Sequence, residues 1–281
     1  MTNALISVQA LADRLGDDPP VVFDCRSDLL DPAAGRTAWR AGHVPGALHA
    51  DLDQDLAAPV TGASGRHPLP TADAFAAFLA GAGWSPGREI VAYDAQGGAF
   101  AARLWWLMRY FGHDCVRLLD GGWPAWQRAG LPVAVGEEHP AAVTPVTLEP
   151  DGSQVLDAGE VATGLNDGTL VLVDARDAER FAGHTETIDP VAGHVPGARN
   201  RPFARSLADG LFVSGADLRA DFEACLDGAA PADVVHMCGS GVTACHNLFA
   251  MEQAGLTGSR LYPGSWSEWI RDPSRPVAVV D

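Results

Sequence analysis

Residues 21–52 read VVFDCRSDLLDPAAGRTAWRAGHVPGALHADL, and much of their pattern returns in residues 170–203, LVLVDARDAERFAGHTETIDPVAGHVPGARNRPF. Each stretch opens on a run of β-branched and apolar residues that leads into Asp-x-Arg, and each later contains Gly-His-Val-Pro-Gly-Ala. The stretches that begin at Ile90 and Val234 form a second matching pair. Similarity over so many residues predicts two copies of one domain rather than a short solenoid repeat.

Each copy alternates strand-like with helix-like segments. In the first copy the strand-like runs are Val21–Asp24, Ile90–Tyr93 and Val116–Leu119, and the helix-like runs are residues 71–82 and 99–111. This alternation predicts an α/β fold in which each domain is a parallel sheet flanked by helices on both faces. We expect a first domain at residues 1–130, an extended linker rich in Pro, Glu and Val at 131–153, and a second domain at 154–281.

Charge and composition exclude several classes of function. The 281 residues include 19 Lys and Arg against 36 Asp and Glu, a formal net charge of −17. Such a charge repels phosphate backbones and anionic lipids, so neither a nucleic-acid nor a membrane partner is expected. The N-terminus lacks the basic start and apolar block of a secretory signal. Five cysteines, none in a C-x-x-C pair, favour a reducing cytoplasmic setting over a disulfide scaffold or a zinc site.

The repeat is an internal control, because a feature present in both copies is needed by the fold and a feature of one copy is a candidate for function. By this test, ion pairs, turn-stabilising histidines and packing tryptophans are structural: Asp24 with Arg26, Asp174 with Arg176, His43 and His194, and Trp123 and Trp266.

Cys238 is the main difference between the copies. It lies in VVHMCGSGVTACHNL, residues 234–248, and the first copy has Asp94 at the matching position. The cysteine ends a predicted strand, and a glycine-containing loop and a helix over Thr243–Gln253 follow it. Backbone N–H groups of such a loop and the positive end of the helix dipole stabilise a thiolate over a thiol. We therefore interpret Cys238 as a nucleophile and the other cysteines as packing residues: Cys25, Cys115, Cys225 and Cys245.

Two chemistries use a cysteine in such a loop. A Cys-based phosphatase needs an arginine at the sixth position after the cysteine, to bind the phosphoryl oxygens. Ala244 occupies that position here, which argues against a phosphatase.

Over residues 5–275 the chain resembles the tandem-domain rhodanese family of sulfurtransferases. The resemblance rests on the two copies of Asp-x-Arg and Gly-His-Val-Pro-Gly-Ala and on a cysteine loop in the second copy only. The loop CGSGVTA is similar to that of the 3-mercaptopyruvate sulfurtransferases, whereas thiosulfate sulfurtransferases typically carry two cationic residues at the positions of Gly239 and Ser240.

This resemblance implies transfer of sulfur from 3-mercaptopyruvate to a thiophilic acceptor, such as cyanide, a thiol or thioredoxin, through a persulfide on Cys238. The cysteine carries the group, so no metal and no organic cofactor is expected. The loop residues Gly239, Gly241, Val242 and Thr243 are implied to contact the substrate. Two alternatives stay open: a thiosulfate sulfurtransferase with an unusual loop, and a sulfur-carrier or binding module with little turnover.

The resemblance also implies roles for residues outside the loop. Ser240, His67 and Asp53 would form a proton relay, although His67 and Asp53 also fit a surface loop and a helix cap. Arg180 matches the family arginine that binds the substrate carboxylate, and Leu30 faces it in the first copy. The family often has a second substrate arginine between Arg180 and Gly193. This chain has none there, and His184 is the nearest substitute in sequence.

Overall fold

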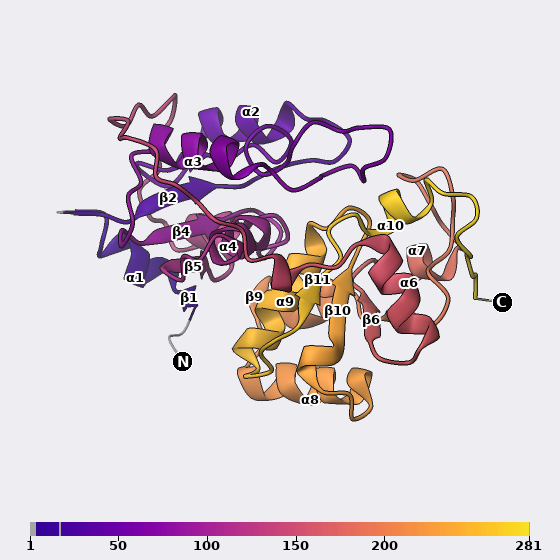
Figure 1. Ribbon diagram of the computed structural model, residues 1–281. Coiled ribbons are helices and arrows are strands. Elements are labelled where there is room, and N and C mark those ends of the chain that lie inside the picture. Colours follow the sequence, from indigo (N-terminus) through magenta and orange to yellow (C-terminus); the bar gives the residue numbers. More distant parts are fainter. Residues whose placement is uncertain (1–3, 17, 281) are drawn as a thin grey trace. The chain divides into compact units, whose positions relative to one another are not determined.

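The computed structural model describes residues 4–16 and 18–280, which divide into two compact units (Figure 1). Unit 1 comprises residues 1–58, 69–151 and 209–212, and unit 2 comprises residues 59–68, 152–208 and 213–281, as far as these are described. The segment at residues 59–68 thus belongs to the second unit, although in sequence it lies within the first copy of the repeat.

Unit 1 is built on a five-stranded parallel sheet with the strand order β1-β5-β4-β2-β3. Its strands are β1 (Leu5–Ile6), β2 (Val21–Asp24), β3 (Leu48–His49), β4 (Ile90–Tyr93) and β5 (Val116–Leu119). β2 and β4 are buried throughout, as expected of strands that have neighbours on both sides and helices on both faces. The three predicted strands of this copy are confirmed residue for residue.

The helices of unit 1 are α1 (Val8–Ala12), α2 (Ala34–Ala41), α3 (Ala72–Gly81), α4 (Ala101–Tyr110) and α5 (Gly122–Arg128). Side-chain caps start two of them: Ser7 accepts a hydrogen bond from the N–H of Ala10, and Thr71 from that of Ala74. The predicted helices at residues 71–82 and 99–111 are confirmed as α3 and α4, each slightly shorter than expected.

Unit 2 repeats the plan. Its parallel sheet has the order β11-β10-β6-β7, and Val155 pairs with Leu261 at the outer edge, where β1 lies in unit 1. The strands are β6 (Val171–Asp174), β7 (Arg199–Asn200), β10 (Val234–Met237) and β11 (Arg260–Leu261). Two further two-residue strands lie outside this sheet, β8 (Leu207–Ala208) and β9 (Leu211–Phe212), and the residues of β9 are assigned to unit 1. Parallel sheets flanked by helices confirm the predicted fold class.

The helices of unit 2 are α6 (Ala158–Asn166), α7 (Ala178–Ala182), α8 (Gly215–Leu226), α9 (Thr243–Gln253) and α10 (Ser265–Trp269), with short 3-10 turns at Gly152–Gln154, Phe203–Ser206 and Pro231–Asp233. In Figure 1, β6, β10 and β11 lie between α6 on one side and α9 on the other. The predicted helix Thr243–Gln253 is α9, with the same bounds.

Features shared by the copies have the structural roles that the internal control predicts. Arg26 binds Asp24 at 2.5 Å and Arg176 binds Asp174 at 2.7 Å, and each guanidinium lies 4.8 Å from the ring centroid of a tryptophan, Trp123 or Trp266. Each tryptophan belongs to the apolar core of its unit.

Within the described residues, no helix combines the length and the apolar character needed to cross a bilayer.

Candidate active site

Cys238 follows the last residue of β10 and precedes α9. Its backbone is fixed on both sides, because its N–H donates to Oγ of Ser265 at 3.1 Å and its carbonyl accepts from the N–H of Trp266 at 3.0 Å. The next residue is fixed in the same way, since the carbonyl of Gly239 accepts from the N–H of Ser267 at 2.9 Å. The start of α10 thus holds the cysteine loop in place.

The loop points backbone N–H groups at the sulfur. Sγ of Cys238 accepts from the N–H of Gly241 at 3.1 Å and from that of Ser240 at 3.4 Å. Gly241 makes this turn with a φ of +77°, and a Cβ there would clash with the carbonyl oxygen of Pro263. The described chain provides no side-chain cap for α9, which begins immediately after this loop. A negative charge on the sulfur therefore faces N–H donors and the positive end of a helix dipole.

Asp94 occupies the equivalent place in unit 1. It follows β4, and its carbonyl accepts from the N–H of Trp123 at 2.8 Å, as that of Cys238 does from Trp266. Its carboxylate accepts four backbone N–H bonds of 2.7 to 2.9 Å, from Gln96, Gly98, Phe100 and Ala101. The first copy thus fills its loop with an internal anion, which demonstrates what kind of group this backbone arrangement accommodates.

Three of the remaining cysteines have environments that differ from that of Cys238, whereas Cys115 is exposed and is therefore not the packing residue that the sequence predicted. Burial raises the pKa of Cys25, and the charges of Asp94 and Asp24 raise it further. Burial also raises the pKa of Cys225. Cys245 lies inside α9 and donates its thiol proton to the carbonyl of Gly241 at 3.3 Å. These surroundings favour protonated thiols, which are poor nucleophiles.

Ser240 and His67 meet beside the cysteine loop. Nδ1 of His67 lies 2.7 Å from Oγ of Ser240, and both residues are at least nine-tenths buried. His67 reaches the loop because residues 59–68 belong to unit 2. A histidine in hydrogen-bond contact with a hydroxyl can move a proton to or from it.

Asp53 belongs to unit 1 and lies in the turn after β3. Its N–H donates to Oδ1 of Asp51 at 3.0 Å. Burial raises the pKa of Asp53, and the charge of Asp51 adds to this shift. Its part in a relay with Ser240 and His67 stays a prediction.

Arg180, on α7, lies next to the cysteine loop. Its Nη1 and Nη2 are 3.8 and 3.7 Å from the position that a Cβ on Gly239 would occupy. Its Nε and Nη2 also bind the carboxylate of Glu186 at 2.9 to 3.2 Å. His184 instead contacts a carboxylate oxygen of Glu179 and the carbonyl of Val280, each at 3.3 Å.

The two other predicted loop residues form the start of α9. Val242 is buried at the cap position, and its carbonyl accepts from the N–H of Cys245 at 3.0 Å. Thr243 is the first residue of the helix and is half-buried.

Arg66 is a further side chain beside the cysteine loop, and the sequence analysis did not single it out. Its Nη2 lies 2.8 Å from the position of a Cβ on Gly239, nearer than either nitrogen of Arg180. Its place beside His67 is the sequence signal that could have indicated it.

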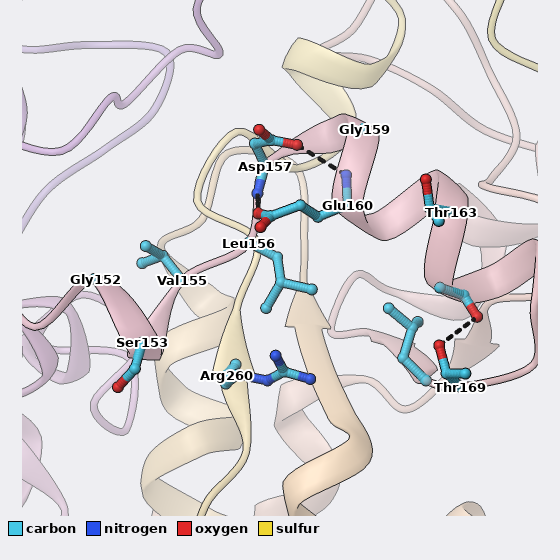
Figure 2. Close-up of a pocket in the computed structure, with 12 residues that line it drawn as sticks. Gly152, Ser153, Val155, Leu156, Asp157, Gly159, Glu160, Thr163, Thr169 and Arg260 are labelled. Atoms are coloured by element: carbon cyan, nitrogen blue, oxygen red, sulfur yellow. Dashed lines mark hydrogen bonds between the residues drawn. The ribbon is translucent and has the colours of Figure 1, made fainter.

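A separate pocket in unit 2 lies between the start of α6 and Arg260 (Figure 2). The N-terminus of α6 is already capped there. The Asp157 side chain accepts a hydrogen bond from the N–H of Glu160, and the Glu160 carboxylate accepts one from the N–H of Asp157. The pocket contains no cysteine or histidine and none of the predicted site residues.

Among the described residues, no group of His, Cys, Asp and Glu side chains is arranged to hold a metal.

Known proteins are similar to this chain in sequence and fold. Residues 7–129 and 157–272 match the rhodanese-like domain family. A probable 3-mercaptopyruvate sulfurtransferase of Pseudomonas aeruginosa is 47% identical over 282 residues, which cover 99% of this chain and 98% of that protein. A putative thiosulfate sulfurtransferase of Mycobacterium tuberculosis is 38% identical, covering 98% of this chain and 96% of that protein. The structure of 3-mercaptopyruvate sulfurtransferase from Leishmania major superposes with a TM-score of 0.83 at 30% identity, covering 95% of this chain and 74% of that one.

Two matches of one domain account for both halves of the repeat, and the Pseudomonas relative aligns over both halves. The chain belongs to the rhodanese-like family, with two copies of the domain.

Proposed function

We propose that this protein is a sulfurtransferase that takes sulfur from 3-mercaptopyruvate and passes it to a thiophilic acceptor through a persulfide on Cys238. The observation that carries the proposal is the sulfur of Cys238 facing the N–H groups of Ser240 and Gly241 at the start of α9, which no side chain of the described residues caps. The name of the Pseudomonas relative supports the choice of donor.

In the first half-reaction the Cys238 thiolate attacks the sulfur of the donor. A sulfur–sulfur bond forms, the carbon–sulfur bond breaks, and its electron pair leaves as the enolate of pyruvate. The enolate takes up one proton to give pyruvate. Ser240 is placed to donate this proton and His67 to replace it, since Oγ and Nδ1 lie 2.7 Å apart. Asp53 is proposed to complete this relay.

In the second half-reaction an acceptor attacks the outer sulfur of the persulfide. Cyanide leaves as thiocyanate, and a thiol leaves as a new persulfide, in each case regenerating the Cys238 thiolate. Loop N–H groups that stabilise the persulfide anion also stabilise the thiolate that replaces it. Thioredoxin is a proposed acceptor.

All five cysteines are free thiols, which supports the predicted cytoplasmic setting.

Thiosulfate is the alternative donor, because the Mycobacterium relative carries that name. Thiosulfate is a compact dianion and would gain from cations in the loop, where this chain has Gly239 and Ser240. The neutral loop therefore favours a donor with one carboxylate and a carbonyl.

Steady-state rates with each donor, with cyanide as acceptor, test the proposal. We expect a strong preference for 3-mercaptopyruvate and no transfer by Cys238→Ser. Ser240→Ala should lower kcat with 3-mercaptopyruvate roughly 100-fold, because the enolate loses its proton donor. Ser274→Ala, which changes an exposed serine, is the matched control. Preference for thiosulfate would contradict the choice of donor, and turnover of neither would leave a sulfur-carrier module.

A further inference from the structure

Arg260 is an arginine of unit 2 that has no partner among the described residues. It is the first residue of β11, is half-buried and lines the pocket beside the start of α6 (Figure 2). Its Nε is buried, and none of its nitrogens forms a hydrogen bond or an ion pair within the described chain. Buried donors without an acceptor are rare in folded proteins, so this guanidinium is suited to an acceptor that the chain does not supply.

The first copy of the domain has an arginine at the same place. Arg117 of β5 and Arg260 of β11 each pair with the second residue of the neighbouring central strand. Arg117, however, has an acid partner, because its Nε binds Oε1 of Glu89 at 2.9 Å. The same carboxylate also binds Arg14, which follows α1. In unit 1 this arginine therefore has an internal carboxylate.

Unit 2 has neither the same acid nor the second arginine in these places. Glu89 directly precedes β4, and the residue that directly precedes β10 is the shorter Asp233, which forms no ion pair with Arg260. Counted from the residue that caps each helix, the position of Arg14 is occupied by Gly164, which lines the pocket. Without these side chains, Arg260 borders a pocket of about 780 Å³.

The internal control that identified Cys238 applies here as well. An arginine at this place is common to both copies, whereas its lack of an acid partner is particular to unit 2. The ion pair between Arg117 and Glu89 also shows which group such an arginine receives, namely a carboxylate.

The other end of the pocket carries two acids. Asp157 and Glu160 cap α6 with one oxygen each, Oδ1 and Oε2, and their second oxygens accept no hydrogen bond from the described residues. Figure 2 shows this pair above Leu156 and Arg260 below it. In a protein of formal net charge −17, these carboxylates disfavour a purely anionic ligand and favour one that also carries a cation.

We propose that this pocket is a second small-molecule site of unit 2, which binds an amino acid in its zwitterionic form. The carboxylate of the amino acid pairs with Arg260, as that of Glu89 pairs with Arg117 in unit 1. Its ammonium group faces the free oxygens of Asp157 and Glu160. The pocket contains no residue of the cysteine loop, so the inference goes beyond the proposed sulfur transfer and does not depend on it.

Calorimetry with glycine, β-alanine and 4-aminobutanoate tests the site, because these amino acids differ in the distance between their two charges. Acetate and methylamine each supply one of the charges alone. We expect at least one of the amino acids to bind the wild-type protein more tightly than acetate or methylamine does. Arg260→Gln should weaken this binding roughly tenfold or more, because the carboxylate loses a charged pair of donors.

Arg117→Gln is the matched control, since it removes the equivalent arginine of unit 1, which Glu89 already binds. We expect it to leave amino-acid binding unchanged. Glu160→Gln keeps an oxygen for the capping hydrogen bond and removes the charge. It should weaken the binding of the amino acid, whereas the binding of acetate should not fall. Thermal unfolding of every variant verifies the fold.

Arg180→Gln separates this pocket from the surroundings of Cys238, and amino-acid binding should persist in it. Binding that is lost in Arg180→Gln but kept in Arg260→Gln would place the amino acid beside the cysteine loop and overturn the inference. Equal affinities of the wild-type protein and Arg260→Gln would also overturn it, as would the failure of every amino acid of the series to bind the wild-type protein at millimolar concentrations.

Discussion

Cys238 and Asp94 occupy equivalent positions in the two units but have different numbers of backbone N–H partners. Both follow a central strand, and the side chain of each accepts backbone N–H bonds at the start of the next helix. The Asp94 carboxylate uses four such donors for itself. In the proposed function, Sγ of Cys238 instead acquires another sulfur atom and loses it again.

Asp55 is a second residue whose surroundings change its chemistry. Burial raises its pKa from 3.8 to about 6, although its Oδ2 accepts the N–H of Asp51 at 2.8 Å. The folded state therefore binds the proton more tightly than the unfolded state does, so the free energy of unfolding falls as pH rises through the interval from 3.8 to about 6.

Replacing this carboxyl should remove that pH dependence. Asp55→Asn keeps an oxygen that can accept the N–H of Asp51 but cannot ionise. Relative to the variant, the wild-type free energy of unfolding should fall by about 2 kcal/mol between roughly pH 4 and pH 6 and stay level above that. Urea unfolding of both proteins across this range measures the difference. A difference that does not vary with pH would contradict the shift.

At the scale of elements, the loop between β10 and α9 depends on two glycines for different reasons. Gly241 needs its positive φ and also has no space for a Cβ, whereas Gly239 leaves room for Arg66. The sequence shows that both are glycines, but only the fold separates the two causes.

Gly241→Ala should therefore damage the site as well as the fold. The substitution strains the backbone and drives the loop away from Pro263, which moves the N–H of residue 241 off the sulfur of Cys238. We expect sulfur transfer to fall roughly 100-fold. Gly228→Ala is a matched control, since Gly228 has a φ of +83° with nothing within 4 Å of its Cβ position. It should lower stability by about 1 kcal/mol and keep full activity. Wild-type activity in Gly241→Ala would show that the loop does not need this geometry.

The elements that the sequence predicted well are those with strong local signals. Short, mainly apolar runs identified β2, β4 and β5, and α9 matches in its bounds. The two-residue strands β1, β3, β7 and β11 were not predicted, because so short a pairing is decided by its neighbours in the sheet rather than by its own residues.

At the scale of the whole molecule, the duplication made it possible to identify candidate site residues from the sequence. Comparison of the copies singled out Cys238 and Arg180 because unit 1 has Asp94 and Leu30 in their places. The same comparison could not find Arg66, because residues 59–68 lack a periodic pattern and no local signal shows that they join unit 2. The contact between His67 and Ser240 joins residues 173 positions apart and was expected only through the family resemblance.

The overall charge explains why recognition must be local. A formal net charge of −17 repels anions at long range, and a small anionic donor would be among them. In the proposed function, donor capture must then depend on local groups such as the N–H groups of Ser240 and Gly241 that face the sulfur of Cys238.

The most direct test of the account is mass spectrometry of the intact and proteolysed protein after incubation with 3-mercaptopyruvate in the absence of an acceptor. The account predicts one added sulfur atom per chain, located on the peptide that contains Cys238, with one pyruvate released and the sulfur lost again on addition of cyanide. Sulfur located on another cysteine, or pyruvate formed while Cys238 stays unmodified, would contradict it.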